Sequence, residues 1–286
     1  MKKAAKLMAL VLATGCVMGM ATACEEGEKL ALGKEMITQT SQLDALTQLK
    51  AGAVDAVVID SIMAGYYSTK GEFAGQVSIV KDLVLAEESY GIAAKKGNEA
   101  FMSEINKALI ALTADGTTAE VATEFGLQND VAVKADTVNP YAAATDNSWE
   151  TIVSEGEIVI GYTVFAPIAY TEGDDFTGFD IELAREVVDY LNETYELELT
   201  VEFQLIEWSA KESLLENGTI DLVWNGMTIT EERSAQMCIS VPYLYNKQVA
   251  VVAKADEAKY TTKDSFKDAV IGVESGSAGE SVVKGE

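Results

Sequence analysis

Arginine is scarce in this chain, and its guanidinium group is the side chain best suited to hold an organic acid. The 286 residues contain two arginines, Arg185 and Arg233. A guanidinium can grip a carboxylate through two parallel hydrogen bonds. Histidine is absent, which excludes histidine-based acid–base catalysis, Ser-His and Cys-His nucleophile pairs, and histidine-ligated zinc. These residue types favour binding over catalysis, and we expect no catalytic residue, no metal site and no cofactor.

The composition sets the class of partner. There are 46 acidic and 21 basic side chains, giving a net charge of −25 and a pI near 4.3. Affinity for nucleic acid comes largely from neutralising phosphates with basic side chains, so DNA and RNA are excluded as partners. Hydrophobic residues make up 48% of the chain, which is typical of a globular protein.

The first 24 residues predict a secretory signal. A segment with three lysines precedes an apolar run, and small residues follow. The sequence from Ala21 to Cys24 resembles the cleavage box of bacterial lipoproteins, which predicts a lipoprotein signal peptide over 1–24 with Cys24 lipidated. Cys16 is a competing site, and a plain signal peptide is the alternative. The third cysteine, Cys238, has no partner within the expected folded body, so no internal disulfide is predicted.

Helix-like and strand-like segments alternate after the signal. The apolar spacing predicts helices over 41–52, 99–115, 117–126 and 179–192. Short apolar runs predict strands over 56–60, 90–95, 157–163, 199–206, 220–224, 248–253 and 270–273. Residues 134–150 break this periodicity and contain Asn139-Pro140, which is typical of a linker. Repeated strand–helix units predict an α/β fold with buried, largely parallel sheets.

Five motifs in order carry a family resemblance. They are Gly161–Pro167, Phe176–Asp180, Gly218–Arg233, Val241–Tyr243 and Gly272–Glu280. Each motif alone is weak, but their order and spacing resemble those of the family 3 extracellular solute-binding proteins, the polar amino-acid receptors of ABC importers. Residues 41–126 resemble the other part of the same family. The resemblance implies a two-lobed α/β fold of the periplasmic-binding-protein type II.

The order of these two parts departs from the family. In relatives the part resembling 41–126 follows the part resembling 157–280, and here it comes first. Each part occurs once, so the chain is interpreted as a circular permutant, which is tolerated when the original termini lie close together. A rearranged or misassembled gene is the alternative. In the permuted chain, residues 134–155 would link the ancestral C- and N-termini.

The resemblance also implies the limits of the lobes. Lobe 1 would comprise 91–133 and 156–242, and lobe 2 would comprise 29–86 and 248–286. Two crossover strands, near 86–90 and 243–247, would join them. The ligand would be trapped between the lobes.

Two charged residues are the strongest site candidates that the resemblance implies. Arg233 matches the arginine that clamps the ligand α-carboxylate, although an exposed helix residue paired with Glu231 or Glu232 is the alternative. Asp60 matches the acid that accepts from the ligand ammonium. Its alternative role is the N-cap of the following helix, and both roles are compatible.

The remaining candidates come from the same motifs. Gly226 and Thr228 lie at a strand end, where backbone groups and the Thr228 hydroxyl can meet a zwitterion. Ser277 and Ala278 form a second Gly-rich turn, in which Ala278 offers a backbone N–H alone. A second set comprises aromatic residues that would contact the ligand side chain: Phe165, Trp208 and Tyr162.

Specificity is only partly constrained by the sequence. Relatives that select basic amino acids tend to place an acid where Tyr162 stands, so arginine and lysine are not favoured. Glu274 stands where glutamine receptors can carry a lysine, so glutamine is not supported either.

We therefore predict a monomeric, lipid-anchored receptor on the cell surface or in the periplasm. It would capture a polar amino acid and deliver it to an ABC permease. A sensory module that binds ligand without transport is one alternative. A dehydratase-like enzyme on the same scaffold is another, and it would need a buried carboxylic acid with a raised pKa in the cleft.

Overall fold

The computed structural model describes residues 30–286. The predicted signal peptide, with Cys16 and Cys24, lies outside the described residues. Within 30–286, no helix is both long enough and apolar enough to cross a membrane.

A single nine-stranded sheet runs through the whole molecule. Its order is β1-β11-β2-β10-β3-β8-β4-β7, with β9 paired to β3. Pairing is parallel at both ends of this order and antiparallel around β3 and β10 in the middle. The strands are β1 (Glu35–Gln39), β2 (Ala56–Asp60), β3 (Val77–Lys95), β4 (Glu157–Tyr162), β7 (Thr200–Leu205), β8 (Leu222–Thr228), β9 (Met237–Ile239), β10 (Leu244–Ala253) and β11 (Val270–Glu274).

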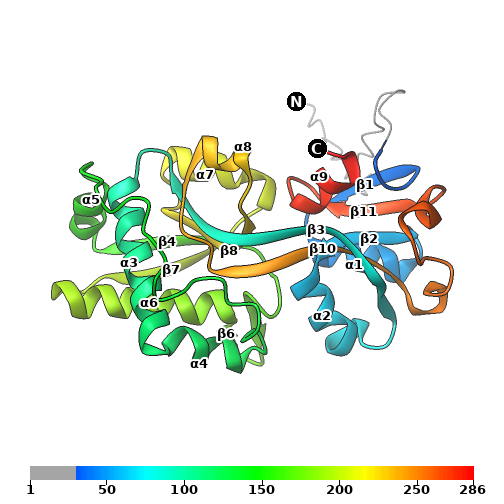
Figure 1. Ribbon diagram of the computed structural model, residues 1–286, viewed down its shortest axis with the longest axis horizontal. Coiled ribbons are helices and arrows are strands. Elements are labelled where there is room, and N and C mark those ends of the chain that lie inside the picture. Colours follow the sequence, from blue (N-terminus) through cyan, green and yellow to red (C-terminus); the bar gives the residue numbers. More distant parts are fainter. Residues whose placement is uncertain (1–29) are drawn as a thin grey trace, which may run out of the picture.

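The two central strands join two bodies. β3 and β10 pass side by side from one body into the other (Figure 1). The first body surrounds β1, β2 and β11, and the second surrounds β4, β7, β8 and β9. The predicted α/β class is confirmed. The strands expected over 90–95 and 248–253 are parts of these longer strands, because the crossovers pair with each other and continue the ladder.

Three helices cover the first body: α1 (Gln42–Ala51), α2 (Ser61–Thr69) and α9 (Ala278–Lys284). α1 begins where the Ser41 hydroxyl accepts from the Asp44 amide, and it ends at Gly52, whose φ is 73°. Glycine adopts this left-handed backbone conformation readily, and the conformation ends the helix. Every residue of β2 is buried, as expected for a strand covered on both faces.

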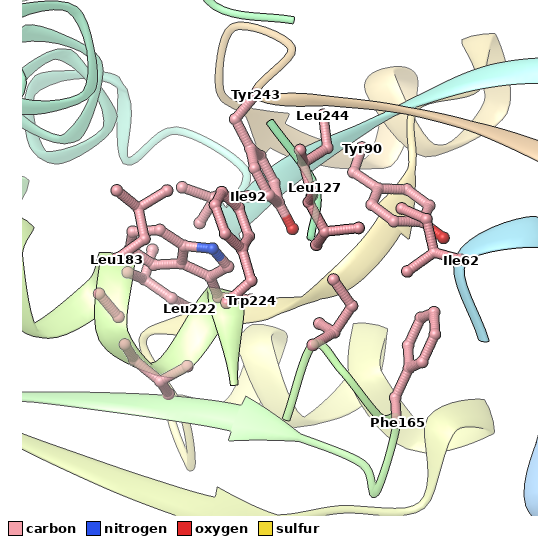
Figure 2. Close-up of a cluster of buried hydrophobic side chains, with 14 of the residues drawn as sticks. Ile62, Tyr90, Ile92, Leu127, Phe165, Leu183, Leu222, Trp224, Tyr243 and Leu244 are labelled. Atoms are coloured by element: carbon pink, nitrogen blue, oxygen red, sulfur yellow. The ribbon is translucent and has the colours of Figure 1, made fainter. Parts of the chain in front are cut away.

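Six helices pack around the second body: α3 (Glu99–Asp115), α4 (Thr117–Glu124), α5 (Ser148–Glu155), α6 (Phe179–Tyr195), α7 (Lys211–Asn217) and α8 (Glu231–Gln236). A small hairpin of β5 (Tyr170–Glu172) and β6 (Asp175–Thr177) lies outside the main sheet. The core here is rich in aromatic side chains. Trp224 lies among Ile92, Leu183 and Leu222, next to Tyr243 (Figure 2).

The expected linker contains a helix. α5 occupies its last eight residues, and Trp149 stacks on Phe101 with ring centroids 6.4 Å apart. Asp146 holds the start of α5 by accepting from the Ser148 amide at 3.0 Å. The same carboxylate accepts from Ala100, at the start of α3, at 2.8 Å. The periodicity failed to indicate α5 because only two short turns of amphipathic sequence follow the polar break.

The two ends of the described chain lie together. The amides of Ala31 and Leu32 donate to the carbonyl of Val283 at 2.9 and 3.3 Å. β1 and β11 pair in parallel over five residues each. The C-terminus and the first described strand are thus neighbours on the first body (Figure 1).

Candidate functional site

A pocket between the two bodies collects the predicted residues. It is narrow, with a cavity volume of about 20 Å³. Its lining residues from the sequence-based prediction are Asp60, Phe165, Trp208, Gly226, Thr228, Arg233, Ser277 and Ala278. Its further lining residues are Gln42, Met63, Thr163, Val164, Asn225 and Glu274.

Arg233 is fixed by backbone carbonyls from both bodies. It lies in α8, whose first turn is capped by the Thr230 hydroxyl accepting from the Arg233 amide at 3.1 Å. Nη1 donates to the Thr228 carbonyl at 2.8 Å, and Nη2 donates to the Gly276 carbonyl across the gap at 3.0 Å. A guanidinium has five N–H donors, so donors remain for a carboxylate. The alternative, an exposed residue paired with its acidic neighbours, does not describe this geometry.

Asp60 ends β2 and lines the same pocket as Arg233, from the other body. Its Oδ1 accepts from the Tyr90 hydroxyl at 2.7 Å and from Gln248 at 3.1 Å. Asn246 donates to the same oxygen, and Gln42 donates to Oδ2. Asp60 occupies the N-cap position of α2, as the alternative predicted, but its side chain makes no capping bond there. Oδ2 accepts from one protein donor, which leaves it able to accept from an ammonium group.

Gly226 and Thr228 form the strand edge beside Arg233. The Gly226 amide donates to Asp180 at 2.8 Å, and its φ of 60° is left-handed. A Cβ at Gly226 would lie 2.7 Å from a ring carbon of Phe165. Thr228 is 6% exposed and supplies the carbonyl that orients Arg233. The backbone at this edge is therefore shaped around both the arginine and the aromatic wall.

Two of the three predicted aromatic residues line the pocket. Phe165 is 3% exposed and meets Tyr90 edge to face, with centroids 6.4 Å apart. Figure 2 shows Phe165 next to Tyr90, away from the Trp224 cluster. Trp208 lies under the guanidinium of Arg233, 6.0 Å from the ring centroid. Tyr162 does not line the pocket, because its ring packs against Phe176 with centroids 4.7 Å apart.

The second turn comes from the first body. Gly276 has a φ of 72°, and Ser277 caps α9 by accepting from the Glu280 amide at 3.1 Å. The Ser277 hydroxyl oxygen is thus used as a cap acceptor, while its hydrogen remains available as a donor. Lys211, which sequence analysis missed, reaches this turn from α7 and donates to the Gly276 carbonyl at 3.4 Å. Its side chain is 2% exposed.

Two carboxyl groups of the pocket have raised pKa values. Burial, followed by repulsion from Glu88, raises the pKa of Asp60 to about 8. Burial, with repulsion from Asp60, raises the pKa of Glu274 to about 8. Desolvation favours the neutral form of an acid. Both groups therefore hold their protons more tightly than a solvent-exposed carboxyl group does. Within 30–286, no three acidic or cysteine side chains gather closely enough to hold a metal ion.

The residues that sequence analysis missed come from elements that touch only in the fold. Gln42 begins α1, Met63 lies in α2, and Thr163 and Val164 follow β4. The amide of Asn225 hydrogen-bonds the Thr163 hydroxyl at 2.7 Å. One signal was available: Glu274 is an acid at the end of a buried strand, directly before a Gly-rich turn.

Part of this chain matches the model of a known protein family. Residues 158–276 match the model of the bacterial extracellular solute-binding proteins, family 3. The predicted resemblance is confirmed over this stretch, which carries four of the five motifs in full and most of the fifth. The two bodies joined by two crossing strands agree with the two-lobed α/β fold that the resemblance implies.

Two curated relatives are binding proteins. The arginine-binding extracellular protein ArtP of Bacillus subtilis is 34% identical over 116 residues, or 41% of this chain and 42% of ArtP. The L-cystine-binding protein TcyJ of Escherichia coli is 29% identical over 124 residues, or 43% of this chain and 44% of TcyJ. The chain thus spans less than half the length of these relatives.

Solved structures give matches of similar extent. A polar amino acid ABC uptake transporter substrate-binding protein from Streptococcus thermophilus is 40% identical and has a TM-score of 0.27. The match covers 34% of this chain and 35% of that one. A histidine-bound ABC uptake transporter substrate-binding protein from Streptococcus pneumoniae is 36% identical with a TM-score of 0.27, covering 33% and 36%.

Proposed function

We propose that this protein is the extracytoplasmic substrate-binding protein of an ABC importer and that it captures a polar amino acid. Arg233 binds the α-carboxylate, and Asp60 accepts from the α-ammonium group. Phe165 and Trp208 pack against the side chain of the ligand. The single observation that carries this proposal is that Arg233 and Asp60, from opposite bodies, line one buried pocket.

The narrow pocket implies a movement of the two bodies. A cavity of about 20 Å³ is too small for an amino acid to diffuse through. The bodies must therefore part at the crossovers for entry and close again on the ligand. Affinity then requires groups from both bodies, as in hinge closure around a ligand.

Calorimetry against the twenty amino acids, alone and with an arginine variant, tests the site. Arg233→Ala removes charge-assisted hydrogen bonds to the carboxylate, and we expect affinity to fall by about 100-fold or more. Arg185→Ala is the matched control, because Arg185 pairs with Glu182 at 2.8 Å on the surface of α6. Unchanged binding by Arg233→Ala would refute the assignment.

Location and partners follow from the same proposal. The predicted signal and Cys24 would anchor the protein to the outer side of the cell membrane as a monomer, where it meets the transmembrane subunits of a permease. Mass spectrometry of the protein isolated from membranes tests this, since a diacylated Cys24 as the first residue is expected. Lipidation at Cys16, or an unmodified N-terminus, would contradict it.

A dehydratase-like activity is the alternative that one observation favours. Asp60 and Glu274 are buried carboxyl groups whose pKa values are raised to about 8, as a general acid requires. Incubation of the protein with the amino acid it binds, followed by NMR, separates the two functions. Recovery of unaltered ligand is expected for a receptor, and a sensory module would share that result but lack a permease partner.

We also propose that the chain is circularly permuted, with the predicted lobe limits of 91–133 with 156–242 and 29–86 with 248–286. Contacts between the chain ends support this, since Ala31 and Leu32 donate to Val283. Residues 134–155 link the ancestral termini, although they include α5. A short peptide could join the ends without disturbing β1 or β11.

Rejoining the ends tests the permutation. A variant that begins at Tyr141, runs to Glu286 and continues through a short linker from Leu30 to Pro140 should fold, because it keeps the contacts of Asn139 and Asp146 with α3. It should bind the same amino acid within a few-fold of the original affinity. The control uses the same join but opens the chain within α3, which should abolish folding. Failure of the first variant to fold would contradict the permutation.

A further inference from the structure

Glu274 is a buried acid of the pocket that forms no ion pair with any described residue. It ends β11, lines the pocket and is 4% exposed. Gln42 donates to Asp60 and lies close enough to the Glu274 carboxyl group to lower its pKa. Across residues 30–286, none of the ion pairs includes Glu274. One neutral amide thus lies beside two buried acids.

The charges of the pocket do not balance around a neutral amino acid. Its charged lining residues are Arg233, Asp60 and Glu274. A zwitterion gives its carboxylate to Arg233 and its ammonium to Asp60, which leaves Glu274 without a counterion. With such a ligand Glu274 must stay protonated, because an ionised carboxylate that is buried without a counterion is strongly unfavourable. A second positive charge on the ligand would instead let Glu274 ionise and form an ion pair.

The nearby Lys211 already has other partners. Lys211 Nζ lies 2.9 Å from the carboxylate of Glu212. It also donates to the carbonyls of Trp208 and Gly276, at 3.3 and 3.4 Å. Its ammonium therefore holds the turn after β11 and is not within ion-pair distance of Glu274.

We infer that Glu274 selects an amino acid whose side chain carries a second positive charge, an ammonium or guanidinium group. This inference rests on the proposed function. The methylene groups of such a side chain pack between the apolar walls that include Phe165 and Met63, and its cation pairs with Glu274. The acid that basic amino-acid receptors place at the position of Tyr162 is here supplied by β11 instead.

Calorimetry with matched ligands tests the selection. Lysine is compared with norleucine, and arginine with citrulline, since each pair differs chiefly in the side-chain charge. We expect each cationic ligand to bind at least about tenfold more tightly than its neutral partner. Equal or tighter binding of the neutral ligands, still dependent on Arg233, would overturn the inference and leave the proposed function standing. If no amino acid binds, both fail.

A variant of Glu274 tests whether this residue causes the selection. Glu274→Gln removes the charge at similar shape, and we expect the preference for lysine over norleucine to disappear. The matched control is Glu198→Gln, which removes one charge from an exposed acid outside the pocket and should keep the preference. A preference retained by Glu274→Gln would contradict the inference.

Proton release provides a readout on the unmodified protein, in case the variant does not fold. At pH 7 both pocket acids are largely protonated, because their pKa values are raised to about 8. The groups that face Glu274 are Gln42, Asp60, Lys211 and Arg233. Lysine should expel about two protons, one from each acid, as measured by calorimetry in buffers of different ionisation enthalpy. Release of one proton or none would contradict the pairing.

Discussion

Gly226 shows how closely the backbone of the pocket is fitted to its walls. Its φ of 60° and its missing side chain both matter, because a Cβ would lie 2.7 Å from Phe165 and 3.0 Å from Tyr90. Neither ring is at the flexible end of a long side chain, and both are buried. The glycine is thus a requirement of the site.

Gly226→Ala should therefore harm both stability and binding. The strained φ and the clash should lower the free energy of unfolding by about 1–3 kcal/mol, measured by urea denaturation. Ligand affinity should also fall, because Phe165 must shift. Gly218→Ala is the control: Gly218 has a φ of 73° with nothing within 4 Å, so it should lose about 1 kcal/mol and keep full affinity. Intact binding by Gly226→Ala would show that Phe165 is not a pocket wall.

At the scale of elements, the N-termini of helices position the charged groups of the site. α8 has six residues, too few to be stable without tertiary support. The Thr230 hydroxyl caps its first turn through the Arg233 amide. The cap thus fixes the backbone of the residue that binds the carboxylate.

Thr230→Ala should loosen Arg233. Loss of a helix cap lowers the free energy of unfolding by about 1 kcal/mol, and ligand affinity should fall as well because the guanidinium loses its fixed approach. Thr262→Ala removes the cap of the short 3₁₀ helix Lys263–Phe266, which does not line the pocket. This control should lose similar stability in thermal unfolding but retain the affinity. Equal affinities of the two variants would argue against a positioning role for α8.

At the scale of the whole molecule, buried acids make stability depend on pH. Burial raises the pKa of Asp180 to about 7, and those of Asp60 and Glu274 to about 8. A carboxyl group with a higher pKa in the folded than in the unfolded chain holds its proton more tightly when folded. Protonation therefore favours folding. This contribution is lost progressively as the pH rises from the ordinary pKa values of 3.8 to 4.5 to the raised values of about 7 to 8.

The ligand-free protein should accordingly melt at a higher temperature at pH 5 than at pH 8. The net charge of −25 acts in the same direction, because self-repulsion grows as acids ionise. Glu274→Gln separates the two causes in differential scanning calorimetry, since it removes one buried acid, which faces Gln42, Asp60, Lys211 and Arg233. The variant should show a smaller difference between pH 5 and pH 8. A larger difference would contradict the sign.

The local elements and the strongest motif residues could be predicted from the sequence alone. Helical spacing indicated α3 over its whole length, and the motif order indicated that Arg233, Asp60 and Phe165 belong together. Helices and strands depend on the periodicity of neighbouring residues, and motifs are read along the chain. Both signals survive a change in the order of the two parts, because neither depends on where the chain begins.

Which side chains share the pocket could be seen only in the tertiary structure. It brought Gln42 and Glu274 together from α1 and β11, and it turned Tyr162 away against Phe176. It also folded α5 within the expected linker, where Trp149 finds Phe101. These outcomes depend on contacts between residues far apart in the chain. Packing and burial of charge select such contacts only once the elements have assembled.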